Sequence, residues 1–172
     1  MQISHRARTL RCIMNGRVVS LGELRGEPWG SRCGYAVMPR RKSSVERLVI
    51  QMIQRILPRF AEKLLAAEIE ITAPTDGVVT AVGEGRLTLR TGDGICVTAA
   101  VGNGLQLLPE VGKQVRCSDV ICRASADSLS GNGFHGAVAV FFAQPDRITE
   151  LHIFAGYRRA VRRTAFFRIR DI

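Results

Sequence analysis

The sequence predicts a mainly β protein: an antiparallel β-sandwich or barrel with an internal repeat, forming one domain over residues 1–172. Three observations lead to this prediction. Valine-rich runs recur between glycine, asparagine and aspartate turns, which is typical of strands. One such unit occurs twice, as NGRVVSLG at residues 15–22 and DGVVTAVG at residues 76–83. A chain of 172 residues with 46% apolar composition can bury a core without disulfide bonds.

Each copy of the repeat leads into a second candidate strand, GYAVMP at 34–39 and GRLTLRT at 85–91. The Asn-Gly and Asp-Gly pairs favour turns with positive φ, and valine suits a half-buried pleated surface. Two similar β units in one chain predict a pseudo-symmetric arrangement. Further strands are expected at 94–101, at 114–124 with a break near Ser118 and Asp119, at 136–143 and at 164–172.

Residues 40–68 have a different pattern, which predicts an amphipathic helix at about 43–66 inserted into the β domain. Ser43 and Glu46 form a capping box, and apolar residues then recur with helical spacing. Pro58 is expected to break the helix, which resumes from Arg59 to Ala66. The preferred interpretation is a helix that lies on the sheet and covers its open side. A basic helix on anionic lipid and a dimerisation helix are the alternatives.

The net charge of +10, with 22 arginines and three lysines, indicates acidic partners: nucleic acid, anionic lipid or an acidic protein. The segment 157–170 concentrates arginine beside aromatic residues, as a nucleic-acid site would. A hairpin with Phe167 and Ile169 inward and arginines outward explains the same pattern and is favoured. The candidate basic patch comprises Arg158, Arg159, Arg162, Arg163, Arg168 and Arg170.

Cysteine and histidine spacing indicates neither disulfide bonds nor a metal site. The five cysteines are odd in number and include no CxxC pair, and the three histidines lack ligand spacing. The N-terminus has no apolar segment of the kind a secretory signal needs, and no apolar run could span a bilayer. We therefore expect a cytoplasmic protein with no cofactor and no bound metal.

Four segments, in order, resemble the glucose-type enzyme IIA of the bacterial phosphoenolpyruvate:sugar phosphotransferase system. They are GYAVMP (34–39), ITAPTDGVVTAV (71–82), PEVGKQVRCSDVI (109–121) and DRITELHIFAGYRRAVRRTAFFRIRD (146–171), the last matching a helical turn, a spacer and a final strand. The resemblance covers nearly the whole chain, with residues 40–68 as an insertion. It implies a β-sandwich with a shallow apolar depression where two histidines meet. One of them accepts a phosphoryl group from the carrier HPr and passes it to enzyme IIB.

The resemblance places Ala100 at the phosphoacceptor position and Gly85 at the partner histidine position. No histidine lies between His5 and His135, so the family mechanism is not available to this chain. Cys96 is an alternative acceptor on the same strand, but it lies four residues before the reactive end. The resemblance implies a partner-binding face around the same depression, for which the candidates are Val82, Leu87, Val101, Gly102, Asn103 and Gly104.

The leading functional hypothesis is a non-phosphorylatable enzyme IIA-like protein that acts as a regulatory, protein-binding module. Contact with HPr or enzyme IIB is not expected, because those partners meet enzyme IIA through basic rims and this chain is itself basic. Two alternatives stay open. One is an active phosphotransferase component for sugar uptake that uses a non-histidine acceptor. The other is a basic protein that binds nucleic acid or a membrane surface.

Overall fold

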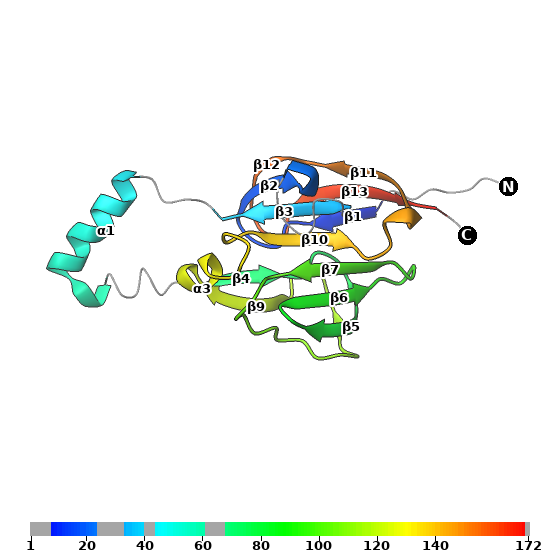
Figure 1. Cartoon of the computed structure of the whole chain (residues 1–172), viewed down its shortest axis with the longest axis horizontal. Coiled ribbons are helices and arrows are strands. Elements are labelled where there is room, and N and C mark those ends of the chain that lie inside the picture. Colours follow the sequence, from blue (N-terminus) through cyan, green and yellow to red (C-terminus); the bar gives the residue numbers. More distant parts are fainter. Residues whose placement is uncertain (1–7, 24–32, 40–43, 61–67, 171–172) are drawn as a thin grey trace.

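A computed structural model describes residues 8–23, 33–39, 44–60 and 68–170. It is built from thirteen strands in these ranges, with a few short helices (Figure 1). The strands are β1 (Arg8–Arg11), β2 (Gly16–Ser20), β3 (Gly34–Met38), β4 (Glu68–Thr72), β5 (Gly77–Gly83), β6 (Arg86–Arg90), β7 (Cys96–Ala100), β8 (Gln114–Val115), β9 (Val120–Ser125), β10 (Val138–Phe142), β11 (Ile148–Ile153), β12 (Gly156–Arg158) and β13 (Arg163–Ile169). The helical elements are η1 (Leu21–Glu23), α1 (Ser44–Ile56), α3 (Ala126–Ser130) and η2 (Pro145–Arg147).

The largest sheet has eight strands in the order β12-β2-β3-β10-β7-β6-β5-β8. This order is symmetric about the β10–β7 pair: β3 and β2 follow on one side, β6 and β5 on the other. The paired strands β2–β3 and β5–β6 are the two copies of the sequence repeat, and all these pairings are antiparallel. The predicted pseudo-symmetric arrangement is therefore present in the sheet.

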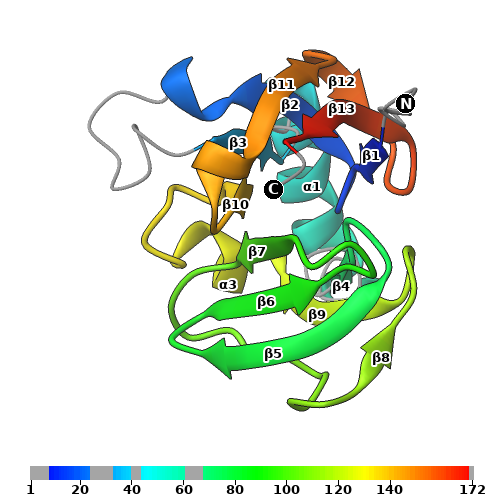
Figure 2. The same cartoon turned by 90° about the vertical axis from the view of Figure 1, so that its right-hand side faces the viewer.

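Two smaller sheets, β1-β13-β11 and β4-β9, complete a sandwich with the large one. Leu10 and Phe167 of the first small sheet and Ile71 of the second belong to the same buried cluster as Val97 and Val140 of the large sheet. Figures 1 and 2 show β1, β2, β3 and β13 in one half of the molecule, β4 to β7 and β9 in the other, and β10 between them. The predicted antiparallel β-sandwich is confirmed.

Gly16 and Gly77, the glycines of the two repeated turns, were expected to allow a positive φ, but they are needed for a different reason. Neither Gly16 nor Gly77 has a positive φ. A Cβ atom on Gly16 would overlap the carbonyl oxygen of Met38, and one on Gly77 would lie 2.8 Å from that of Arg90. Glycine is therefore required at both positions because the neighbouring strand passes too close for a side chain.

The C-terminal quarter contains more strand than predicted. A helical turn, η2, and a final strand, β13, occur as expected, but the intervening spacer forms β11 and β12. β11 pairs with β13, and β12 extends the large sheet by pairing with β2. The expected strand near 114–124 divides into β8 and β9, and the break falls at Ser118, whose φ is 79°.

Helix α1 does not cover the sheet, so the preferred interpretation of the insertion is wrong. None of its residues is buried, and Val45, Leu48 and Met52 are each at least 60% exposed. Figure 1 shows the helix beside the β domain. The helix ends at Ile56, and helical geometry resumes at residues 58–60, so the break expected at Pro58 is present. Ser43 and residues 61–66 lie outside the described residues. No helix in the described ranges is long and apolar enough to cross a bilayer.

Candidate functional site

Ala100 lies in a row of paired residues that crosses one face of the large sheet from β6 to β2. In this row Ala100 of β7 is opposite Arg86 of β6 on one side and Ala139 of β10 on the other. Ala139 is in turn opposite Ala36 of β3, which is opposite Val19 of β2. Paired residues in adjacent strands point to the same face. Apart from Arg86, the row consists only of alanine and valine.

This face is closed over Ala100. Ala36, Ala100 and Ala139 are fully buried, in a cluster separate from the main core. Its other members are Val19, Leu21 and Phe141, with Met38 and Phe134 packed against it. The Arg86 guanidinium lies 5.9 Å from the centre of the Phe141 ring, close enough for a cation–π interaction. The cluster is therefore a buried apolar group with one cation, Arg86, at its edge.

Two threonines, Thr88 of β6 and Thr98 of β7, lie opposite each other on the same face of the sheet as Ala100. The hydroxyl groups of Thr88 and Thr98 lie 3.0 Å apart and hydrogen bond to each other. Thr98 is also nearly buried, at 6% exposure. In this part of the sheet the two threonine hydroxyl groups therefore bond to each other, and the Ala100 cluster beside them consists of apolar side chains.

Gly85 lies against the end of β7, in the turn between β5 and β6. Its φ is +70°, and its carbonyl oxygen accepts hydrogen bonds from the backbone N–H groups of Val101 (2.8 Å) and Gly102 (3.2 Å). A Cβ atom at Gly85 would overlap the carbonyl oxygen of Gly102. This position therefore has no room for any side chain.

Asn132 is a fully buried polar residue that connects the end of β7 to the loop before β10. Its side-chain amide donates to the carbonyl oxygens of Val101 (2.8 Å) and Ala137 (3.0 Å), and its side-chain oxygen accepts the N–H groups of Phe134 (2.9 Å) and Gly136 (3.2 Å). The sequence analysis missed this residue. Only a GNG turn signal at 131–133 marks it, and that signal does not indicate burial.

The expected partner-binding face needs correction at two positions. Leu87 and Val101 are fully buried in the main core. Leu87 is opposite Ala99 and shares its face, whereas Ala100 is opposite Arg86 on the other face. Side chains alternate between faces along a strand, so Leu87 cannot lie beside Ala100.

The remaining positions of the expected face differ in accessibility. Gly102 is buried, whereas Asn103 and Gly104 are exposed and Val82 is 37% exposed. Val82 is opposite Leu87 in the β5–β6 pair and therefore also lies on the face away from Ala100. The expected residues thus contribute Val82, Asn103 and Gly104 to the surface, and they do not form one patch around Ala100.

Four of the five thiols are made less reactive by burial. Burial raises the pKa of Cys12, Cys33, Cys117 and Cys122 above that of an ordinary thiol, which keeps them protonated. Cys96 lies at the start of β7, opposite Arg90, and is partly exposed. Ala100 is four positions further along the strand, about 13 Å away. All five cysteines are free.

The arginines of the candidate basic patch are distributed along β12, the following turn and β13. Arg168 pairs with Glu150 at 3.2 Å, and the Arg158 guanidinium lies 5.9 Å from the centre of the Phe154 ring. Arg159, Arg162, Arg163 and Arg170 are exposed. Phe167 is buried and its neighbour Arg168 is exposed, so the expected alternation of the hairpin is confirmed.

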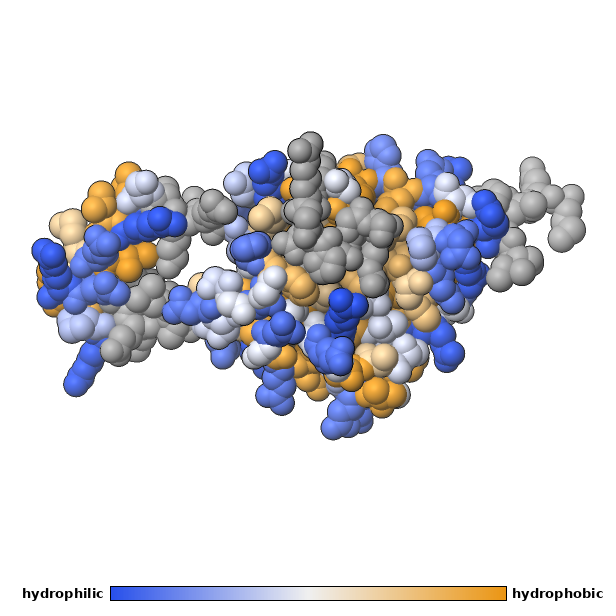
Figure 3. All heavy atoms as spheres, in the orientation of Figure 1, coloured by the Kyte–Doolittle hydropathy of each residue, from blue (hydrophilic) through white to orange (hydrophobic). Residues whose placement is uncertain are grey.

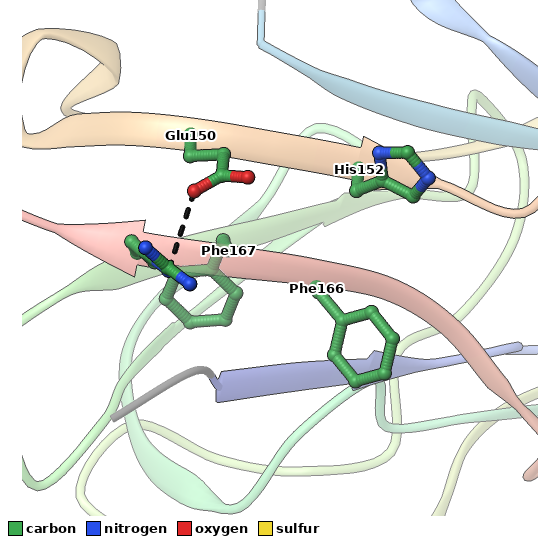
Figure 4. A pocket seen from close by; sticks show the side chains of 5 residues that line it. Glu150, His152, Phe166 and Phe167 are labelled. Carbon is green, nitrogen blue, oxygen red and sulfur yellow. Dashed lines mark ion pairs between the residues drawn. The ribbon is translucent and has the colours of Figure 1, made fainter. Parts of the chain in front are cut away.

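A depression of about 230 Å³ lies beside these arginines, on the β11–β13 pair (Figure 4). It is lined by the Glu150–Arg168 ion pair, by His152, and by the Phe166 and Phe167 rings. The Phe154 ring meets both His152 and Phe166 edge to face, with ring centres 5.7 and 5.1 Å apart. Both side chains of the ion pair are more than half exposed, so the pair is a surface feature at the rim of the depression. Among the described residues no group of histidine, cysteine and acidic side chains is arranged to hold a metal ion.

Comparisons with known proteins agree with this fold. No family model matches the sequence, and no curated protein matches it. Among solved structures, the glucose permease IIA from Mycoplasma capricolum superimposes with a TM-score of 0.70. The alignment covers 96% of this chain and 99% of that chain, at 13% sequence identity. The chain therefore has an enzyme IIA-like fold over almost its whole length.

Proposed function

We propose that this chain is a non-phosphorylatable enzyme IIA-like protein that acts by binding another protein. One observation carries the proposal: from Ala100 through Ala139 and Ala36 to Val19 the row consists of hydrocarbon side chains, which cannot accept a phosphoryl group. The resemblance places the phosphoryl acceptor at Ala100, whose side chain is a methyl group with no exposed surface.

The Gly85 turn supports the same proposal. The resemblance places the partner histidine at this position, and the backbone of Gly102 occupies the space that a side chain would need. Two features therefore occur together: the acceptor histidine is replaced by Ala100, and the backbone of Gly102 fills the space where the second histidine would be. A loss at one position alone could be repaired by a single substitution, whereas this arrangement needs the backbone to move as well.

The charge of the chain supports a partner other than HPr. The net charge is +10, and Arg86 is the only charged member of the row that crosses Ala100. A partner with an acidic contact surface would be attracted to a chain of this charge, whereas a basic partner would be repelled. We propose an acidic protein as the partner class.

The test is phosphoryl transfer from phosphoenolpyruvate through enzyme I and HPr, followed by intact mass spectrometry of this chain. A glucose-type enzyme IIA in the same reaction is the positive control. We expect added phosphoryl mass on the control and none on this chain. Phosphorylation of this chain would overturn the proposal, and the Cys96→Ser variant would then show whether that thiol is the acceptor.

The binding part is tested separately by titrating the isotope-labelled chain with HPr at low ionic strength and recording amide chemical shifts. We expect no shifts at Arg86, Ala100 or Asn103. Shifts confined to these residues would place the chain back in the phosphotransfer pathway as a competitor for HPr.

A further inference from the structure

Helix α1 and the residues after it form an exposed apolar surface that the β domain does not use. Every described side chain of this segment is exposed or half-buried (Figure 3). Its exposed large apolar residues are Val45, Leu48, Val49, Met52, Ile56, Leu57 and Phe60, with exposures of 48–72%. Apolar side chains of this size and number are normally covered by a partner.

The helix is divided into an apolar and a polar side. At 100° per residue, Val45, Val49, Met52 and Ile56 fall on one side of the helix, with Leu48 and Ile53 flanking them. The opposite side carries Arg47, Gln51, Gln54 and Arg55, all exposed, and no acidic residue. Together these six positions span about 140° of the circumference, wider than the seam that pairs two helices in a coiled coil, and Glu46 lies next to Ile53 at the edge of this span.

The charge of the segment indicates what covers it. Residues 40–63 contain seven basic and two acidic residues, so this stretch of 24 residues supplies half of the net charge of +10. Pairing with a second copy of the chain would bring two such segments together, which like charges oppose. An anionic surface attracts the arginines at the same time as it covers the apolar side.

The length of the helix determines how it could lie in a bilayer. Thirteen residues at a 1.5 Å rise make a helix of about 20 Å, shorter than the roughly 30 Å hydrocarbon core. A strongly amphipathic helix of this kind lies parallel to the membrane, at the boundary between headgroups and acyl chains. We propose that α1 docks on an anionic lipid surface, with Val45, Val49, Met52 and Ile56 among the acyl chains and Arg47 and Arg55 at the headgroup phosphates.

The experiment is co-sedimentation of the full chain with vesicles. One set is phosphatidylcholine alone, and the other contains one third phosphatidylglycerol. We expect binding to the anionic set only. Arg47→Gln with Arg55→Gln should weaken it roughly 30-fold, from the usual contribution of each basic residue near an anionic membrane. Leu48→Glu with Met52→Glu should weaken it by about 100-fold or more, since apolar contact is lost and negative charge is added.

The matched control is Gln54→Ala, which changes the polar side without altering charge and should leave vesicle binding unchanged. All substituted side chains are exposed, so the thermal unfolding of every variant should match that of the parent chain. Equal binding to neutral and anionic vesicles would overturn the proposal. So would a lipid-free dimer, seen by light scattering, that Leu48→Glu with Met52→Glu converts to monomer.

The phosphoryl-transfer assay keeps this proposal separate from the proposed function. None of the three helix variants should alter its result, because α1 is not part of the Ala100 face. If the chain binds anionic vesicles and is also phosphorylated, the proposed function is rejected and the lipid proposal stands. Neither assay depends on the result of the other.

Discussion

Gly85 and Gly102 meet backbone to backbone: the carbonyl oxygen of Gly85 accepts the N–H of Gly102, and a Cβ atom on Gly85 would overlap the Gly102 carbonyl oxygen. The contact joins the β5–β6 turn to the end of β7. It fixes the position of the β5–β6 turn against the end of β7, next to Ala100.

Replacing Gly85 with histidine should therefore destabilise the fold and not restore a site. A left-handed backbone costs a non-glycine residue roughly 1–2 kcal/mol, and displacing Gly102 adds to that cost. We expect a total loss of about 3 kcal/mol or more in urea unfolding. The control is Gly83→His, whose Cβ would meet no atom within 4 Å; its loss should stay below about 1 kcal/mol. Equal losses for the two variants would mean that the turn tolerates side chains.

Ala100→His tests whether the acceptor position can be refilled. The imidazole would enter a fully buried cluster between Ala139 and Phe141. Overpacking a core in this way costs typically 1–3 kcal/mol, and burying a polar ring without a partner adds to it. We expect lower stability and no phosphorylation by HPr, with Ala81→His on the exposed part of β5 as the control. Phosphorylation of Ala100→His would show that the row is open to partners.

Asn132→Ala should be among the most damaging single changes. Four backbone groups hydrogen bond to this side chain, and burial keeps water from replacing it. Each buried backbone group left without a partner costs about 1–3 kcal/mol, so we expect a loss of roughly 4 kcal/mol in chemical denaturation. Asn103→Ala changes an exposed asparagine in the turn after β7, whose N–H donates to the Asn132 carbonyl oxygen, and should cost less than about 0.5 kcal/mol.

Alkaline pH should destabilise the chain through Tyr35. Burial, followed by the neighbouring Cys12 and Cys117, raises the pKa of the Tyr35 hydroxyl well above its ordinary value, and this hydroxyl donates to the carbonyl oxygen of Arg11 at 2.6 Å. The phenol loses its proton more easily in the unfolded chain. Stability is therefore complete below the unfolded pKa of about 10 and falls as the pH rises above it, by about 1.4 kcal/mol per pH unit.

The measurement is the urea midpoint between pH 8 and pH 11.5. Tyr35→Phe loses the hydrogen bond and should start about 1 kcal/mol lower, but its stability should fall less steeply above pH 10. Parallel curves for the two proteins would assign the alkaline loss to other groups. The buried thiol of Cys12 is the first of these, because burial raises its pKa too and its contribution begins at lower pH.

The sequence was sufficient to predict those strands whose signals are local. Turn residues and valine runs mark β2, β3, β5, β6, β7 and β10 within a few residues. β1, β4, β11 and β12 lack such marks. β1 and β11 are held by pairing with β13, which is distant from β1 in the chain. A strand that depends on a distant partner carries little local signal.

The site was harder to predict for a different reason. The face shared by Ala100 and Arg86 follows from strand alternation once the register is known. Leu87 was proposed for the partner-binding face from the resemblance, and only the register of β6 against β7 shows that it points away from the face of Ala100. The helix was predicted with its break, but its exposure could not be derived, since an amphipathic pattern has the same form whether a sheet, a second chain or a membrane covers it.

The central position of β10 has a consequence for how the chain folds during synthesis. The β2–β3 pair joins the β7–β6–β5 strands only through β10, and β1 pairs only with β13 within its sheet. When β2 and β3 leave the ribosome, the strand that links them to the rest is still about 100 residues away, and the partner of β1 is further still. The N-terminal strands therefore keep unpaired edges until these later strands have been synthesised, so pairing of the large sheet depends on contacts between residues far apart in the sequence.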